Sequence, residues 1–153
     1  MGAREYFGEV RRAAERIEEL GRTISGVEDG ELAVGRIGGR VPRASGVGDP
    51  TATEAEARRR FVVAARAERD AALEVVGEAL QVIEGLRRCF SRKAEVMELY
   101  YVDRMEWDQA ADAIGVGRAT AIRWRDEMCD WLDASPRAYV MGCRFLDISQ
   151  SQK

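Results

Sequence analysis

Apolar side chains recur three and four positions apart in two long stretches of the chain. In residues 4–24 they are Phe7, Val10, Ala14, Ile17 and Ile24. In residues 51–90 they are Phe61, Ala65, Ala72, Val76, Ala79, Ile83, Leu86 and Phe90. This spacing places apolar side chains on one face of an α-helix. Acidic and basic residues fill the positions between them, as on a solvated face. The pattern therefore predicts two long amphipathic helices.

The segment between these helices, 25–50, contains seven glycines and two prolines. That content is incompatible with a helix interior, so we expect a connector and an antiparallel, coiled-coil-like helical hairpin over residues 1–90. At 1.5 Å per residue the 51–90 helix would be about 60 Å long, much longer than the first helix that could cover it. We expect its uncovered apolar stripe, including Ile83, to pair with a second copy as a homodimer or higher homo-oligomer.

Residues 91–134 predict three shorter helices, over 91–101, 107–114 and 118–132, with Gly115-Val116-Gly117 between the last two. A helix, a short glycine-containing turn and a second helix form the helix-turn-helix arrangement. We expect Gly115 to take a left-handed conformation and the small Ala111 to let the helices cross closely. The residues expected to be buried are Ala110, Ile114, Val116, Ala121 and Trp124. The fold class is therefore mostly α, with a helical hairpin followed by a three-helix helix-turn-helix domain.

The last of these helices carries the candidate DNA-binding residues. With Ala121, Trp124 and Met128 inward, the opposite side and its flanks would meet the duplex. The candidates are Gly117, Arg118, Ala119, Thr120, Ile122, Arg123, Arg125 and Asp126. Arginines at 118 and 123 suit guanine or phosphate, whereas Arg125 would reach a phosphate from the side. The Gly117 amide and Thr120 suit phosphate, and Ile122 suits a thymine methyl.

Charge sets a limit on this interpretation. The chain has a net charge of −3, and residues 91–133 hold six basic and ten acidic residues, a net charge of −4. Neutralisation of phosphates dominates DNA affinity, so one copy should bind weakly. We expect dimerisation, or a DNA-bound partner such as host RNA polymerase, to supply the rest of the DNA affinity.

Other features narrow the class of protein. The chain has no histidine, which excludes Ser-His-Asp and Cys-His catalysis and histidine-bearing zinc sites. We expect no enzyme activity, no metal ion and no cofactor. The three cysteines have no disulfide or metal-binding spacing, and no apolar run is long enough for a membrane span. We therefore expect free thiols in a protein of the bacterial cytoplasm, with no membrane partner.

The segment Met97–Trp107, together with Gln109–Thr120 and Ile122–Arg125, resembles the helix-turn-helix of sigma-factor region 4. The layout of residues 4–134 is similar to the RinA- or ArpU-like phage and prophage regulators of late transcription. The resemblance implies sequence-specific binding of phage promoter DNA and activation of late genes. Two positions depart from the pattern: Gly117 replaces the usual Ser or Thr cap, and Arg104 stands where such domains often have glycine.

The expected domains are thus a self-associating hairpin in 1–90, a DNA-binding domain in 91–134 and an extension in 135–153. Two other function classes fit the same elements. One is a phage small terminase subunit, although those proteins usually place the DNA-binding unit first. The other is a coiled-coil adaptor that does not bind DNA.

Overall fold

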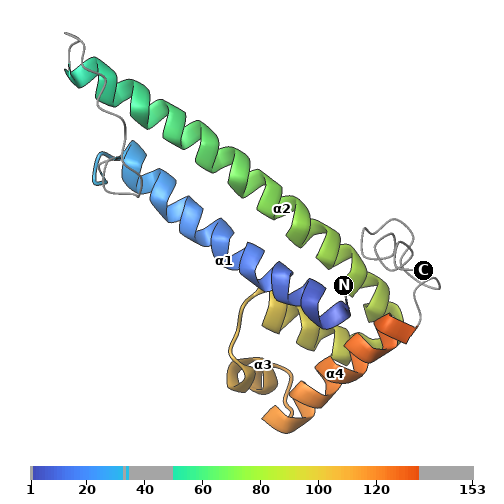
Figure 1. Cartoon of the computed structure of the whole chain (residues 1–153). Coiled ribbons are helices and arrows are strands. Elements are labelled where there is room, and N and C mark those ends of the chain that lie inside the picture. Colours follow the sequence, from blue (N-terminus) through green and yellow to red (C-terminus); the bar gives the residue numbers. More distant parts are fainter. Residues whose placement is uncertain (1, 33, 35–49, 135–153) are drawn as a thin grey trace. The chain divides into compact units, whose positions relative to one another are not determined.

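The structure, a computed structural model, describes residues 2–32, 34 and 50–134 (Figure 1). Its helices are α1 (Ala3–Glu28), α2 (Pro50–Met97), α3 (Trp107–Ala113) and α4 (Arg118–Ala134), with a π-helix, η2 (Glu98–Val102), directly after α2. The described part of the chain is mostly helical, as predicted. Most of the expected connector, and all of the 135–153 extension, lie outside the described residues.

Two helix boundaries differ from the sequence-based expectation. Helix α1 continues to Glu28, so the first residues of the expected connector are helical. Val27, only 1% exposed, lies three positions after Ile24 and extends the buried stripe past Gly26. Helix α2 is interrupted at Phe90, whose φ of −134° and ψ of 50° are not helical. This break coincides with the point where the sequence pattern changes.

The chain divides into two compact units, which do not follow the expected boundary between residues 90 and 91. Of the described residues, unit 1 contains 2–15 and 73–134, and unit 2 contains 16–72. Both long helices therefore contribute to both units. The first half of α1 groups with the C-terminal helices, a grouping that sequence periodicity does not reveal.

Unit 2 is an antiparallel pair formed by the end of α1 and the start of α2. Leu20, Ile24 and Ala65 are buried together, and Phe61 and Val62 pack against them. An ion pair of 2.7 Å between Arg16 Nε and Glu68 Oε1 links the two helices. The Arg16 guanidinium, by its hydrogen bond, lowers the pKa of the Glu68 carboxyl.

Unit 1 contains the apolar cluster shared by α2, α3 and α4. Its buried members are Val96, Ala111, Ile114 and Ala121, and the half-buried residues that pack on them are Leu99, Trp107, Val116 and Trp124. The predicted burial of Ala110, Ile114 and Ala121 is confirmed. Val116 and Trp124 pack on the cluster as expected but remain partly exposed.

One expectation about unit 1 is wrong. Ile83 is 1% exposed, so it belongs to the interior of a single chain and is not available to a second copy. The large apolar side chains that α2 does expose are Val63, Leu73 and Leu80. The reason is that periodicity identifies an apolar face without showing which part of the same chain covers it.

Candidate nucleic-acid interface

A tight turn joins α3 to α4. Only residues 114–117 separate Ala113 from Arg118, and Gly115 has a φ of +68°. The Gly115 amide donates to the Asp112 carbonyl at 3.1 Å, and the Val116 amide donates to the Ala111 carbonyl at 3.0 Å. The left-handed conformation predicted for Gly115 is confirmed, and it lets the chain reverse direction while its amides stay bonded.

A second left-handed residue precedes α3. Arg104 has a φ of +60°, and it is the non-glycine residue with positive φ in the described chain. The Met105 amide donates to the Leu99 carbonyl at 2.9 Å, and Gln109 Oε1 accepts from the Glu106 amide at 3.2 Å at the start of α3. Arg104, which differs from the glycine common in the domains that the sequence resembles, therefore has the backbone geometry that favours glycine.

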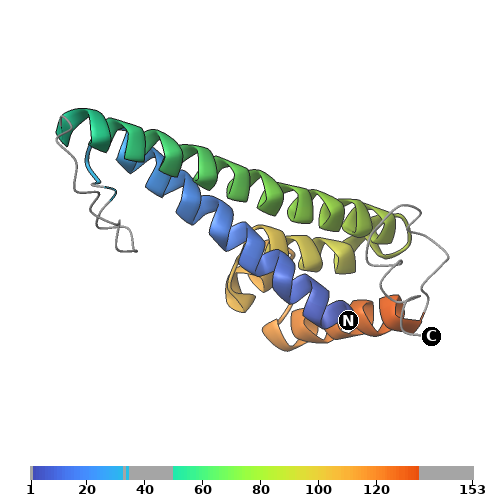
Figure 2. The same cartoon turned by 45° about the horizontal axis from the view of Figure 1, so that its top comes forward.

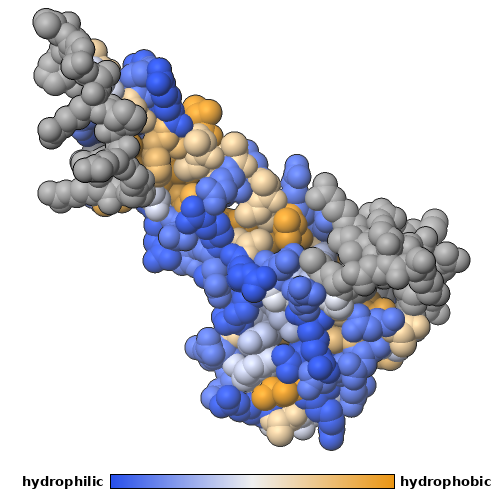
Figure 3. Space-filling model, viewed as in Figure 1, coloured by the Kyte–Doolittle hydropathy of each residue, from blue (hydrophilic) through white to orange (hydrophobic). Residues whose placement is uncertain are grey.

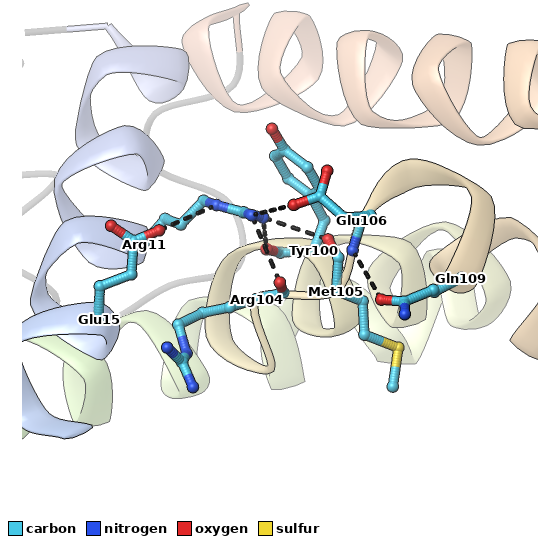
Figure 4. Close-up of polar contacts among 7 residues, drawn as sticks. All are labelled: Arg11, Glu15, Tyr100, Arg104, Met105, Glu106 and Gln109. Carbon is cyan, nitrogen blue, oxygen red and sulfur yellow. Dashed lines mark hydrogen bonds and ion pairs between the residues drawn. The ribbon is translucent and has the colours of Figure 1, made fainter. Parts of the chain in front are cut away.

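Arg11 of α1 holds this turn (Figure 4). Its guanidinium donates to the carbonyl oxygens of Tyr100 at 2.6 Å, Met105 at 3.2 Å and Arg104 at 3.3 Å, and it pairs with Glu106 at 3.3 Å. The Arg11 side chain is 19% exposed. The Arg11 guanidinium thus donates hydrogen bonds to three carbonyl groups that have no helical partner, at the end of η2 and in the turn that follows it. Sequence analysis missed this role, because nothing in the local pattern distinguishes Arg11 from its neighbour Arg12.

Stacked aromatic rings connect the turn to α3 and α4. The Tyr100 and Trp107 rings are parallel to within 15°, with centroids 3.7 Å apart. The Arg11 guanidinium lies 4.3 Å from the Tyr100 ring centroid, and that of Arg125 lies 5.1 Å from the Trp107 ring centroid. Cations over aromatic faces are attracted by the ring quadrupole, so side chains from α1, η2, α3 and α4 form one continuous contact.

The position of Arg125 differs from the expected phosphate contact. Its side chain is 23% exposed and forms an ion pair of 2.8 Å with Asp126. Burial by itself would lower the pKa of Arg125, but a hydrogen bond with Tyr101 and the nearby Asp126 raise it overall. Burial also raises the pKa of Tyr101. Arg125 therefore belongs to the packing behind α4 and not to its exposed face.

The other candidates lie on or beside the exposed side of α4. Gly117, Arg118, Ala119 and Arg123 are exposed, and Thr120, Ile122 and Asp126 are half-buried. Arg118 pairs with Asp108 at 3.3 Å, and Arg123, whose side chain is 67% exposed, pairs with Glu127 at 3.6 Å. Exposed ion pairs of this length contribute little stability, so both guanidinium groups can exchange their carboxylates for phosphate or base acceptors.

The start of α1 lies beside α4 (Figures 1 and 2), and its residues contact acidic side chains of that helix. Arg4 lies 3.5 Å from Asp126 and 3.1 Å from Asp130, and the Ala3 amide donates to Asp133 at 2.8 Å. Lys93 pairs with Glu127 at 2.5 Å, and this hydrogen bond lowers the pKa of the Glu127 carboxyl. These partners offset part of the negative charge on the helix that would approach DNA.

The chain matches no protein-family model, no curated protein and no solved structure. The resemblance to phage late-transcription regulators consequently rests on the residues themselves. None of the helices in the described ranges is both long and apolar enough to cross a lipid bilayer. In the same ranges, no group of three or more acidic or cysteine side chains is arranged to hold a metal ion.

Proposed function

We propose that the chain is a sequence-specific duplex-DNA-binding protein that regulates phage or prophage late transcription through α3 and α4. The observation that carries the proposal is the four-position connection, 114–117, with Gly115 left-handed, between two helices packed on one apolar cluster. A short glycine-containing connection of this kind is typical of a helix-turn-helix, in which the second helix enters the major groove.

The exposed side of α4 carries the side chains that would contact the DNA bases and phosphates. Among the candidate residues, Arg123 has the most exposed long side chain. It lies near the start of α4, where its guanidinium can form two hydrogen bonds with one guanine. Arg118 at the helix start and the free amides of the first turn suit phosphate, because helix N-termini attract anions. Ile122 suits the thymine methyl group.

Negative charge around α4 makes a single copy a weak DNA-binding unit, because phosphate neutralisation supplies most of the affinity. Two copies on one duplex raise the apparent affinity through effective concentration, without any new contact. We therefore include self-association in the proposal, with host RNA polymerase as a further partner that would hold the protein at a promoter.

The experiment is selection of duplexes from a random library by the full-length chain at low salt, followed by sequencing of the bound fraction. We expect enrichment of a defined half-site, which occurs twice in the selected duplexes if two copies bind together. A bound fraction with no enriched sequence, together with equal affinity for any duplex, would overturn sequence-specific recognition. Loss of late-gene transcription on deleting the gene in its host would then test the regulatory role.

A further inference from the structure

Helix α2 exposes an apolar residue within unit 2 that nothing in that unit covers. Val63 is 68% exposed, more than any other large apolar side chain described. It lines an open groove of about 480 Å³ together with Val62, Arg59 and Arg66 of α2 and Val27 of α1. Figure 3 shows apolar surface along α2, interleaved with hydrophilic residues. A partner that covered this groove would remove the Val63 side chain from contact with water.

Two charges of opposite sign flank Val63 on the same side of the helix. Arg59 and Asp70 are exposed, and neither forms an ion pair or hydrogen bond with another described residue. At 100° per residue, positions 59, 63, 66 and 70 fall within about 60° of one another. Their spacing is four, three and four, which reads the same in both directions along the helix.

We propose that residues 59–70 of α2 form a self-complementary face through which two copies of the chain pair antiparallel. A two-fold axis between residues 64 and 65 places Arg59 opposite Asp70 of the second copy, and it places Asp70 opposite Arg59 of the second copy. The same axis places Val63 opposite Arg66, whose aliphatic stem covers it while its guanidinium stays on Glu28 at 2.5 Å. An interface of this kind is isologous, so each favourable pair occurs twice.

The arrangement of the charges, and not their sum, indicates a second copy as the occupant of this face. Residues 59–70 hold four basic and two acidic residues, a net charge of +2, and the groove is lined by Glu28 as well as by Arg58, Arg59 and Arg66. The two exposed charges of this segment without a partner among the described residues, Arg59 and Asp70, lie at equal distances from the midpoint between residues 64 and 65. A second copy in antiparallel orientation therefore places an opposite charge at each of them.

This pairing rests on the self-association included in the proposed function, and it gives that association a location. The test is sedimentation equilibrium of the full-length chain across the micromolar range. Wild type should approach twice the 17.1 kDa chain mass. Arg59→Asp and Asp70→Arg should each raise the dimer dissociation constant by about tenfold or more, because each change turns two attractive pairs into two repulsive ones.

The doubly substituted chain, Arg59→Asp with Asp70→Arg, should recover the wild-type dissociation constant, because the two charges have only changed places. Val63→Asp should give a monomer, and Arg22→Asp, an exposed change in the same unit, should have no effect. All these positions are exposed, and circular dichroism verifies that each variant is folded.

A monomeric wild-type chain, or a double variant as weak as the single ones, would overturn the pairing. The pairing would also be overturned if the wild-type chain is a monomer and Arg59→Asp lowers its affinity for DNA, because this face would then bind DNA. A monomer that still selects a defined duplex would remove the pairing and leave DNA binding by α4 standing.

Discussion

The Arg11 guanidinium lies 4.3 Å from the centre of the Tyr100 ring and also donates a 2.6 Å hydrogen bond to the Tyr100 carbonyl oxygen. The two residues are 89 positions apart in the sequence. The first half of α1 is thereby attached to the turn that leads into α3. Helices α3 and α4 consequently lie in one compact unit with the first half of α1 and the second half of α2.

Removal of the Arg11 side chain should destabilise this unit. Arg11→Ala leaves three carbonyl groups without their donor and is expected to lower the free energy of unfolding by about 2–3 kcal/mol. Arg11→Lys should recover only part of the loss, because one ammonium group cannot bond in several directions from a planar fork. Denaturant titration followed by tryptophan fluorescence measures both. The neighbouring exposed change Arg12→Ala is the control, and an equal loss there would contradict the role of Arg11.

The left-handed residues on either side of α3, Arg104 and Gly115, give a matched pair of backbone predictions. Arg104→Gly should be more stable than Arg104→Ala by about 1 kcal/mol, since both remove the side chain and only glycine accepts a φ of +60° without strain. Gly115→Ala should be less stable than wild type by about 1 kcal/mol for the same reason. Thermal unfolding of the three variants tests this. Equal stability of Arg104→Gly and Arg104→Ala would show that the turn relaxes to another conformation.

The sequence pattern predicted the parts of the structure that depend on residues close to one another in the chain. Helical periodicity located the helices, and Gly115 located the turn, because both are set by local backbone preferences. The pattern was insufficient where distant segments meet. Arg11 and Arg12 look alike in the sequence, and only the approach of residues 100–106 makes one of them a structural residue. The burial of Ile83 and the packed position of Arg125 were missed for the same reason.

The cysteines should differ sharply in reactivity. Cys129 is fully buried, and burial raises its pKa to about 11, whereas Cys89 is exposed. In a chain carrying Cys143→Ser, a thiol reagent at pH 8 should modify one cysteine quickly and the second only after denaturant is added. Loss of the fast reaction on Cys89→Ser identifies the site. Rapid modification of Cys129 in the folded chain would show that the α4 packing opens readily.

The same thiol predicts an alkaline limit to stability. Its pKa is higher in the folded chain than the usual value near 9, so the protonated thiol favours the folded state. The contribution is complete below about pH 9 and is lost as the pH rises through about 11. The free energy of unfolding should therefore fall over this range, and it should fall less steeply in Cys129→Ala. Identical pH dependence in the two proteins would exclude this contribution.

DNA recognition by α4 is the central claim, and its most direct test is a fluorescence anisotropy titration of the selected duplex and of a scrambled duplex. The full-length wild-type chain, Arg123→Ala and the control Arg12→Ala are compared at the same salt concentration. The account predicts that Arg123→Ala loses about 1–3 kcal/mol of binding free energy on the selected duplex and much less on the scrambled one. Arg12→Ala should match wild type on both. Equal affinity of wild type for the two duplexes, or no loss on Arg123→Ala, would contradict recognition through this face.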